Sequence, residues 1–156
     1  MNKLLNIRIQ LNGGDELGRM MDEAAKPEFL LGIACVLMLI GAFAPWETVG
    51  GQYVNALGYW QGTAAFTGGL LLLFGTVVNY DLLRIRQLEM RKPFTNAGIG
   101  VLGSALGLVG ALTYGLTLDP NAATEWGLYL TILAGLFGLS VAYKLYRQEL
   151  PGIPKV

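Results

Sequence analysis

The chain has 156 residues, enough for one domain of average size. Hydrophobic residues make up 53% of it and charged residues only 14%, whereas an average soluble domain is about 25% charged. This deficit of charge indicates a bilayer environment, and the net charge of zero gives no reason to expect a nucleic-acid partner. The chain contains no histidine, the commonest metal ligand and the usual general base near neutral pH. We therefore expect neither a metal centre nor an enzyme.

Four apolar runs follow one another along the chain. Each is about as long as the roughly 20 residues that a helix needs to cross the hydrocarbon core of a membrane. None has an ionised side chain in its middle. The runs cover residues 29–46, 61–80, 94–116 and 126–143. The sequence therefore predicts an all-α, polytopic integral membrane protein with four transmembrane helices.

Lysine and arginine are confined to three segments of the chain. All 11 lie before the first run, between the second and third, or after the fourth, and the loops 47–60 and 117–125 have none. Positive charge beside a span stays on the cytoplasmic side. Both termini are thus expected to be cytoplasmic, in a prokaryotic plasma membrane or an internal energy-converting membrane. The expected cytoplasmic parts are an amphipathic N-terminal tail (1–25), a basic loop (81–91) and a C-terminal tail (147–156).

The chain resembles itself when it is shifted by 66 residues. Residues 26–80 and 92–146 share 12 identities in 55 ungapped pairs, and these include the rarer residues Pro, Asn, Trp and Tyr. Because each unit holds two spans, both units insert the same way up. The sequence predicts two tandem parallel helical hairpins, related by a pseudo-twofold axis along the membrane normal.

Several positions that the two units share, or that flank their spans, have the chemistry of membrane-interface anchors. Trp and Tyr rings settle at the headgroup level, and a lysine at a span end can reach the headgroups. The expected outer anchors are Trp46, Tyr59, Trp60 and Trp126, and the expected inner anchors are Lys26, Tyr80, Lys92 and Tyr146.

Glycines crowd the third and fourth runs. Gly103 and Gly107 form a GxxxG pattern that Gly110 continues, and Ala134 and Gly138 repeat the spacing in the fourth run. Small residues four positions apart let a second helix approach closely. Two interpretations stay open: packing within the four-helix bundle, or a docking face for another subunit or a second copy of the chain.

The first unit resembles a known group of small membrane proteins. Its order of Gly32, "FAPW" at 43–46, Trp60 and Gly68-Gly69 resembles the prokaryotic SPW-repeat membrane proteins, with Ala44 at the position of their serine. The resemblance covers one unit and implies a two-span hairpin without a defined activity.

The sequence offers no reactive constellation to which a reaction could be assigned. We find no nucleophile–base pair, metal-ligand set or phosphate-binding loop, and no intramembrane carboxylate of the kind that marks proton or ion transport. We predict a non-catalytic membrane subunit, either an accessory or scaffold component of a larger complex or a self-oligomer. Its partners are the lipid bilayer and other membrane subunits or itself. No cofactor is predicted, and a bound lipid or pigment stays open. The alternative is a channel or facilitator for a small neutral solute.

Overall fold

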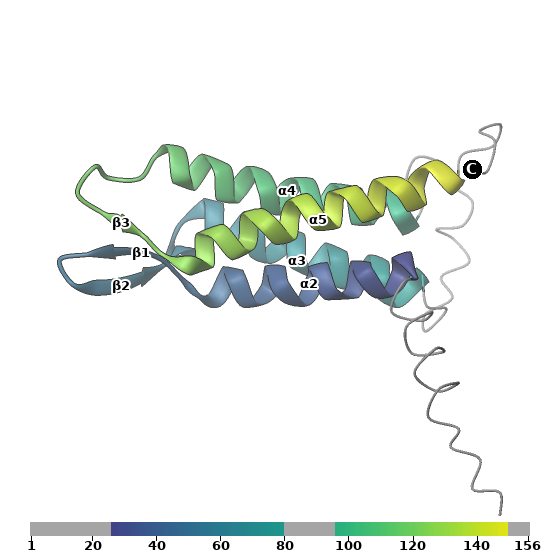
Figure 1. Ribbon diagram of the computed structural model, residues 1–156, viewed down its shortest axis with the longest axis horizontal. Coiled ribbons are helices and arrows are strands. Elements are labelled where there is room, and N and C mark those ends of the chain that lie inside the picture. Colours follow the sequence, from purple (N-terminus) through teal and green to yellow (C-terminus); the bar gives the residue numbers. More distant parts are fainter. Residues whose placement is uncertain (1–25, 80–95, 150–156) are drawn as a thin grey trace, which may run out of the picture.

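The computed structural model describes residues 26–79 and 96–149. Within these ranges the chain is mostly helical, and its four helices run side by side as a bundle (Figure 1). Consecutive helices are antiparallel, each packs against the next, and α2 also packs against α5, which closes the bundle. The helices are α2 (Pro27–Phe43), α3 (Trp60–Asn79), α4 (Asn96–Leu116) and α5 (Trp126–Glu149).

The ends of the helices follow the local sequence. Pro27 occupies the first turn of α2, where its missing N–H would have no partner anyway, and Lys26 before it is extended. The helices α3 and α5 both begin at a tryptophan. The predicted helical runs are confirmed as four helices, although α2 ends at Phe43, before the expected 46, and α5 continues to Glu149.

Two of the four helices are long and apolar enough to cross a membrane. These are α4 over Ala97–Leu116 and α5 over Trp126–Gln148. The helix α2 is apolar but shorter, with 17 residues, and α3 is not one of the two.

A small antiparallel sheet covers one end of the bundle, which the all-α prediction did not include. Its order is β2-β1-β3, with β1 (Pro45–Val49) between β2 (Gln52–Asn55) and β3 (Ala123–Thr124). The hairpin of β1 and β2 turns at Gly50 and Gly51, whose φ angles are 58° and 82°. Two-residue hairpin turns require positive φ at such positions, which glycine adopts without strain. The segment 47–60, expected to be a loop, is thus partly a hairpin.

Buried side chains fill the bundle in two clusters. The cluster nearer the sheet includes Trp46, Ala65, Ala111, Tyr114 and Leu128. The other is built around Leu31, Cys35, Met38, Leu72 and Ala134. Three of the largest fully buried residues, Leu31, Met38 and Leu72, belong to this second cluster, so large apolar side chains occupy the interior between the helices.

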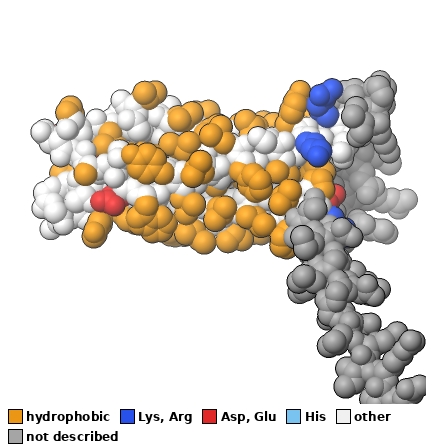
Figure 2. Space-filling model, in the orientation of Figure 1, with side chains coloured by type: hydrophobic (Ala, Val, Ile, Leu, Met, Phe, Trp, Pro, Cys, Tyr) orange, Lys and Arg blue, Asp and Glu red, His pale blue; other side chains and the backbone are white. Residues whose placement is uncertain are grey.

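The outside of the bundle is apolar. Figure 2 shows hydrophobic side chains over the middle of the visible face, with Lys and Arg side chains at one end and an acidic side chain toward the sheet end. A water-soluble helix carries polar residues on its outward face, whereas here all four helices expose large hydrophobic residues. They include Phe29, Ile33, Val36, Ile40 and Phe43 on α2, Leu70 and Leu73 on α3, Leu102, Leu106, Val109 and Leu112 on α4, and Tyr129, Leu133, Leu136, Phe137 and Tyr143 on α5.

Candidate functional site

Glycines bring the backbones of α3 and α4 into direct contact. A Cβ atom added to Gly68 would lie 2.5 Å from the carbonyl oxygen of Gly103 and 2.7 Å from the nitrogen of Gly107. A Cβ on Gly103 would lie 2.7 Å from the carbonyl oxygen of Gly68. The predicted GxxxG pattern therefore packs against α3 of the same chain.

The other predicted packing residues also lie inside the bundle. A Cβ on Gly110 would lie 2.5 Å from the carbonyl oxygen of Gln61, and one on Gly138 would lie 2.8 Å from the Ser104 hydroxyl oxygen. Ala134 is buried beside them. Gly103, Gly107, Gly110, Ala134 and Gly138 are all buried within the bundle.

Three of the four expected outer anchors are exposed at the sheet end. Tyr59, Trp60 and Trp126 stand at or beside the first residues of α3 and α5. Trp46 differs, because it is fully buried. Its indole Nε1 donates a hydrogen bond of 2.7 Å to the carbonyl oxygen of Gly41. The chain leaves α2 after Phe43 and crosses the end of the bundle as β1, where it places this ring inside the core.

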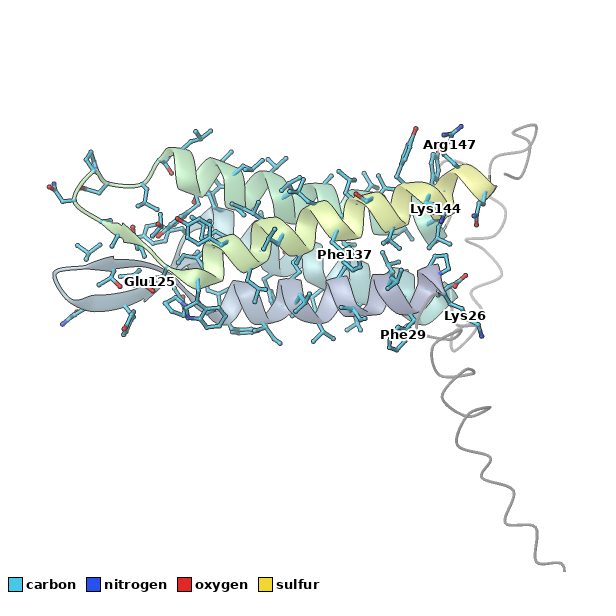
Figure 3. The ribbon with its side chains drawn as sticks, viewed as in Figure 1. Lys26, Phe29, Glu125, Phe137, Lys144 and Arg147 are labelled. Atoms are coloured by element: carbon cyan, nitrogen blue, oxygen red, sulfur yellow. The ribbon has the colours of Figure 1, made fainter. Side chains whose placement is uncertain are left out.

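The expected inner anchors lie at the opposite end, as far as the structure describes them. Lys26 is exposed just before α2, and Tyr146 is partly buried against the core near the end of α5. Lys144 and Arg147 lie at this same end (Figure 3). Tyr80 and Lys92 fall outside the described residues.

The sheet joins the two helical hairpins at one end of the bundle. The Thr48 hydroxyl donates a hydrogen bond of 2.6 Å to Oε1 of Glu125, and the backbone N–H of Glu125 donates one of 2.9 Å to the carbonyl oxygen of Trp46. Together with the pairing of β1 and β3, these bonds connect the start of α5 to the end of α2.

A polar pocket of about 190 Å³ opens beside this sheet. It lies between β1, the first turn of α3 and the end of α4. Glu47 and Gln61 are each 8% exposed and Tyr114 is 5% exposed. Within the described part of the chain, the Gln61 side-chain oxygen and the Tyr114 hydroxyl have no hydrogen-bond partner. The pocket is lined by Glu47, Tyr59, Gln61, Tyr114, Thr117, Leu118 and Asp119.

Sequence reasoning did not find this pocket. Glu47 was visible as the first charged residue after the first apolar run, but Gln61 and Tyr114 stand far from it in the chain and belong to two different predicted spans. Only the crossing of β1 over the end of the bundle brings the three together.

A second hollow, of about 400 Å³, is apolar and lies against α2. Its one side chain with a reactive group is Cys35, whose thiol is buried and directed to the carbonyl oxygen of Gly69 at 3.4 Å. The lining residues are Phe29, Gly32, Ile33, Cys35, Val36, Leu37 and Leu73. This composition offers packing surface and no catalytic chemistry.

The described residues contain no group of three His, Cys, Asp or Glu side chains that could hold a metal ion. Comparison with protein-family models, with curated proteins and with solved structures found no match to this chain.

Proposed function

We propose that this protein is a non-catalytic membrane subunit whose four helices all cross the bilayer. The observation that carries the proposal is where the apolar and the small residues lie on the helices. Large apolar side chains cover the outside of every helix, while glycine, alanine, serine and threonine mediate the close contacts between helices. In lipid, apolar exteriors are solvated by acyl chains, and small residues allow the close packing that associates helices.

The polar side chains on the helices suit this environment. The Thr67 hydroxyl donates a hydrogen bond of 2.8 Å to the carbonyl oxygen of Thr63, and the Ser140 hydroxyl donates one of 2.9 Å to that of Leu136. Both side chains are exposed. Bonding within the helix satisfies them where water is absent, as a bilayer requires.

The shorter helix α2 is part of the same bundle as the long apolar helices α4 and α5. It packs against α5 and turns an apolar stripe outward, from Phe29 through Val36 to Phe43. In water, such a stripe would form a contiguous apolar patch of a size that monomeric soluble proteins rarely expose. Seventeen residues match the lower limit for a spanning helix, about 17.

We propose that the sheet end faces the outside and the opposite end the cytoplasm. Among the described residues, the charged side chains at the sheet end are all acidic, namely Glu47, Asp119 and Glu125. The bases Lys26, Lys144 and Arg147 lie at the other end (Figure 3). Segregation of this sign is the basis of the positive-inside rule.

Cysteine labelling in intact cells tests the orientation. Tyr53→Cys places a thiol on β2, where the native side chain is 74% exposed, and Gln148→Cys places one at the opposite end. A membrane-impermeant maleimide should label the first and not the second. The unsubstituted chain is the control, because its only thiol, at Cys35, is buried. Labelling at 148 without labelling at 53 would reverse the proposed topology.

The two hairpins are proposed to descend from one duplicated unit. The helices α3 and α5 begin at Trp60 and Trp126, 66 positions apart, which is the shift of the sequence repeat. The outer segments differ: the first forms a hairpin of two strands, and the second contributes only β3. The two units therefore differ in their strands at this end of the bundle.

Two features favour the role as a subunit: the interior of the bundle is filled by side chains, and its outer faces are apolar. Leu31, Met38 and Leu72 fill the interior, which favours a packing role over a solute path. The glycine-rich faces of the helices pack against other helices of the same bundle. A partner subunit or a second copy would therefore dock on the outward apolar faces or on the sheet end of the bundle.

Native electrophoresis after extraction in a mild detergent, with mass spectrometry of co-migrating chains, tests the subunit role. The proposal expects a defined complex, of this chain with itself or with another membrane protein. Migration as a monomer under conditions that keep other membrane complexes of the same cells intact would refute it.

A further inference from the structure

We propose that the polar pocket beside the sheet binds a primary ammonium group. This goes beyond the proposed role as a subunit and does not depend on it, since the pocket is defined by side chains of the described chain alone. The pocket combines two buried polar atoms, one buried carboxylate and two aromatic rings.

The pocket has hydrogen-bond acceptors that nothing in the described chain satisfies. The side-chain oxygen of Gln61 is buried and unpartnered. The Tyr114 hydroxyl lies next to the Glu47 carboxylate, and no other group in the described chain pairs with it. Buried polar atoms are almost always hydrogen-bonded, and an exception calls for an explanation such as a bound water, ion or ligand. Both residues line the same pocket, so one small ligand could satisfy both.

The charge of the pocket selects a cation. Glu47 and Asp119 both line it, and the outer segments 47–60 and 117–125 contain no lysine or arginine that could pair with them. A mostly buried carboxylate without a counter-charge is costly, so a bound cation is favoured. Asp119 accepts hydrogen bonds from Asn121 at 2.8 and 3.1 Å, which leaves Glu47 as the main charge partner.

The shape of the site favours an ammonium group over a metal ion. The pocket has two carboxylates, and the described residues contain no group of three His, Cys, Asp or Glu side chains that could hold a metal ion. The rings of Tyr59 and Tyr114 meet edge-on with centroids 5.7 Å apart, and both line the pocket. Aromatic rings beside a carboxylate are a recurrent setting for organic cations.

The acceptors further select a primary ammonium. Its three N–H donors match the Gln61 oxygen, the Glu47 carboxylate and the lone pairs of the Tyr114 hydroxyl. A quaternary ammonium such as choline has no N–H and would leave these acceptors unsatisfied, which costs binding free energy. The ammonium could belong to a free amine or to an ethanolamine lipid headgroup, because the pocket lies at the end of the bundle that carries the exposed Tyr59, Trp60 and Trp126.

Calorimetric titration of the detergent-solubilised full chain with ethanolamine and with choline tests the chemistry. Saturable binding of ethanolamine, at least tenfold tighter than choline, is expected. Glu47→Gln, Gln61→Leu and Tyr114→Phe should each weaken it by about ten- to a hundredfold, the usual effect of losing a hydrogen bond to a charged group. Glu125→Gln is the matched control: it removes an acid at the same end that does not line the pocket, and it should leave the affinity unchanged.

A second arm identifies the source of the ammonium group. Native mass spectrometry from bilayers of equal phosphatidylethanolamine and phosphatidylcholine should show selective retention of the first if the ligand is a headgroup. Equal loss of both lipids, with ethanolamine still bound, assigns the site to a free amine. Circular dichroism verifies that each variant is folded, and the three pocket variants serve as replacements for one another if one is not. Equal affinity for choline, full binding by the folded variants, or binding of neither ethanolamine nor the ethanolamine lipid would overturn the proposal.

Discussion

Replacing Gly68 by alanine should push α3 and α4 apart. The added Cβ would lie 2.5 Å from the carbonyl oxygen of Gly103, and the groups it meets on α4 are all backbone atoms. An ordinary carbon–oxygen contact is about 3.3 Å, so the two helices must separate by about 0.8 Å locally. A gap of that size forfeits roughly a quarter to a half of each dispersion contact along the seam.

The expected cost is about 1–3 kcal/mol of folding free energy, as for other insertions into a packed interior. Gly32→Ala is the matched control. It is also a glycine inside a helix, but its Cβ would meet only the Thr76 methyl group at 3.5 Å, an ordinary contact. Alanine has the higher helix propensity, by about 1 kcal/mol. The control should therefore be neutral or slightly stabilising.

Reversible unfolding in mixed micelles titrated with sodium dodecyl sulfate, followed by circular dichroism, measures both variants. Gly68→Ala should unfold at a lower dodecyl sulfate fraction than the wild type, and Gly32→Ala should not. If the two variants proved equally stable, the close approach of α3 and α4 would not be what holds these helices together.

Three further predictions concern the sheet end of the bundle. Trp46→Phe should lower the stability by about 2 kcal/mol in the same unfolding assay, because it leaves the buried carbonyl oxygen of Gly41 without its donor. Trp126→Phe, at an exposed ring, should change the stability little. Equal effects of the two variants would argue against the buried position of Trp46. Gly51→Ala should cost about 1–2 kcal/mol through its φ of 82° alone, since the space around it is open, and an unchanged stability would exclude the tight hairpin turn. A double-mutant cycle of Thr48→Val and Glu125→Ala should give a coupling of about 1 kcal/mol, because each single variant removes the hydrogen bond between these side chains. Additive effects would show that this hydrogen bond does not join the hairpins.

The helices could be predicted from the sequence because each corresponds to one continuous apolar run. The apolar runs and their flanking polar residues set the ends to within a few positions. The turn at Gly50 and Gly51 was also recorded, since two glycines between β-branched and aromatic residues are a strong local signal for a hairpin. Because the segment 47–60 is short and has no basic residues, it was interpreted as an outer loop, and the hairpin was not predicted.

The buried position of Trp46 could not be predicted, because it depends on a long-range pairing. The residue stands at the end of an apolar run, where a tryptophan is typical of a membrane interface. Its ring is inside because β1 pairs with β3, more than 70 positions away, and crosses the bundle end. The polar pocket has the same origin, since Glu47, Gln61 and Tyr114 meet only once this crossing is made.

Nitroxide accessibility in reconstituted membranes tests whether all four helices cross the bilayer. Single labels at Val36 on α2 and Leu70 on α3, both exposed, are compared with labels at Leu106 on α4 and Leu133 on α5. We predict high collision rates with oxygen and low rates with a polar nickel chelate at all four sites. Access of the chelate to positions 36 and 70, with protection at 106 and 133, would contradict the account and leave only α4 and α5 in the membrane.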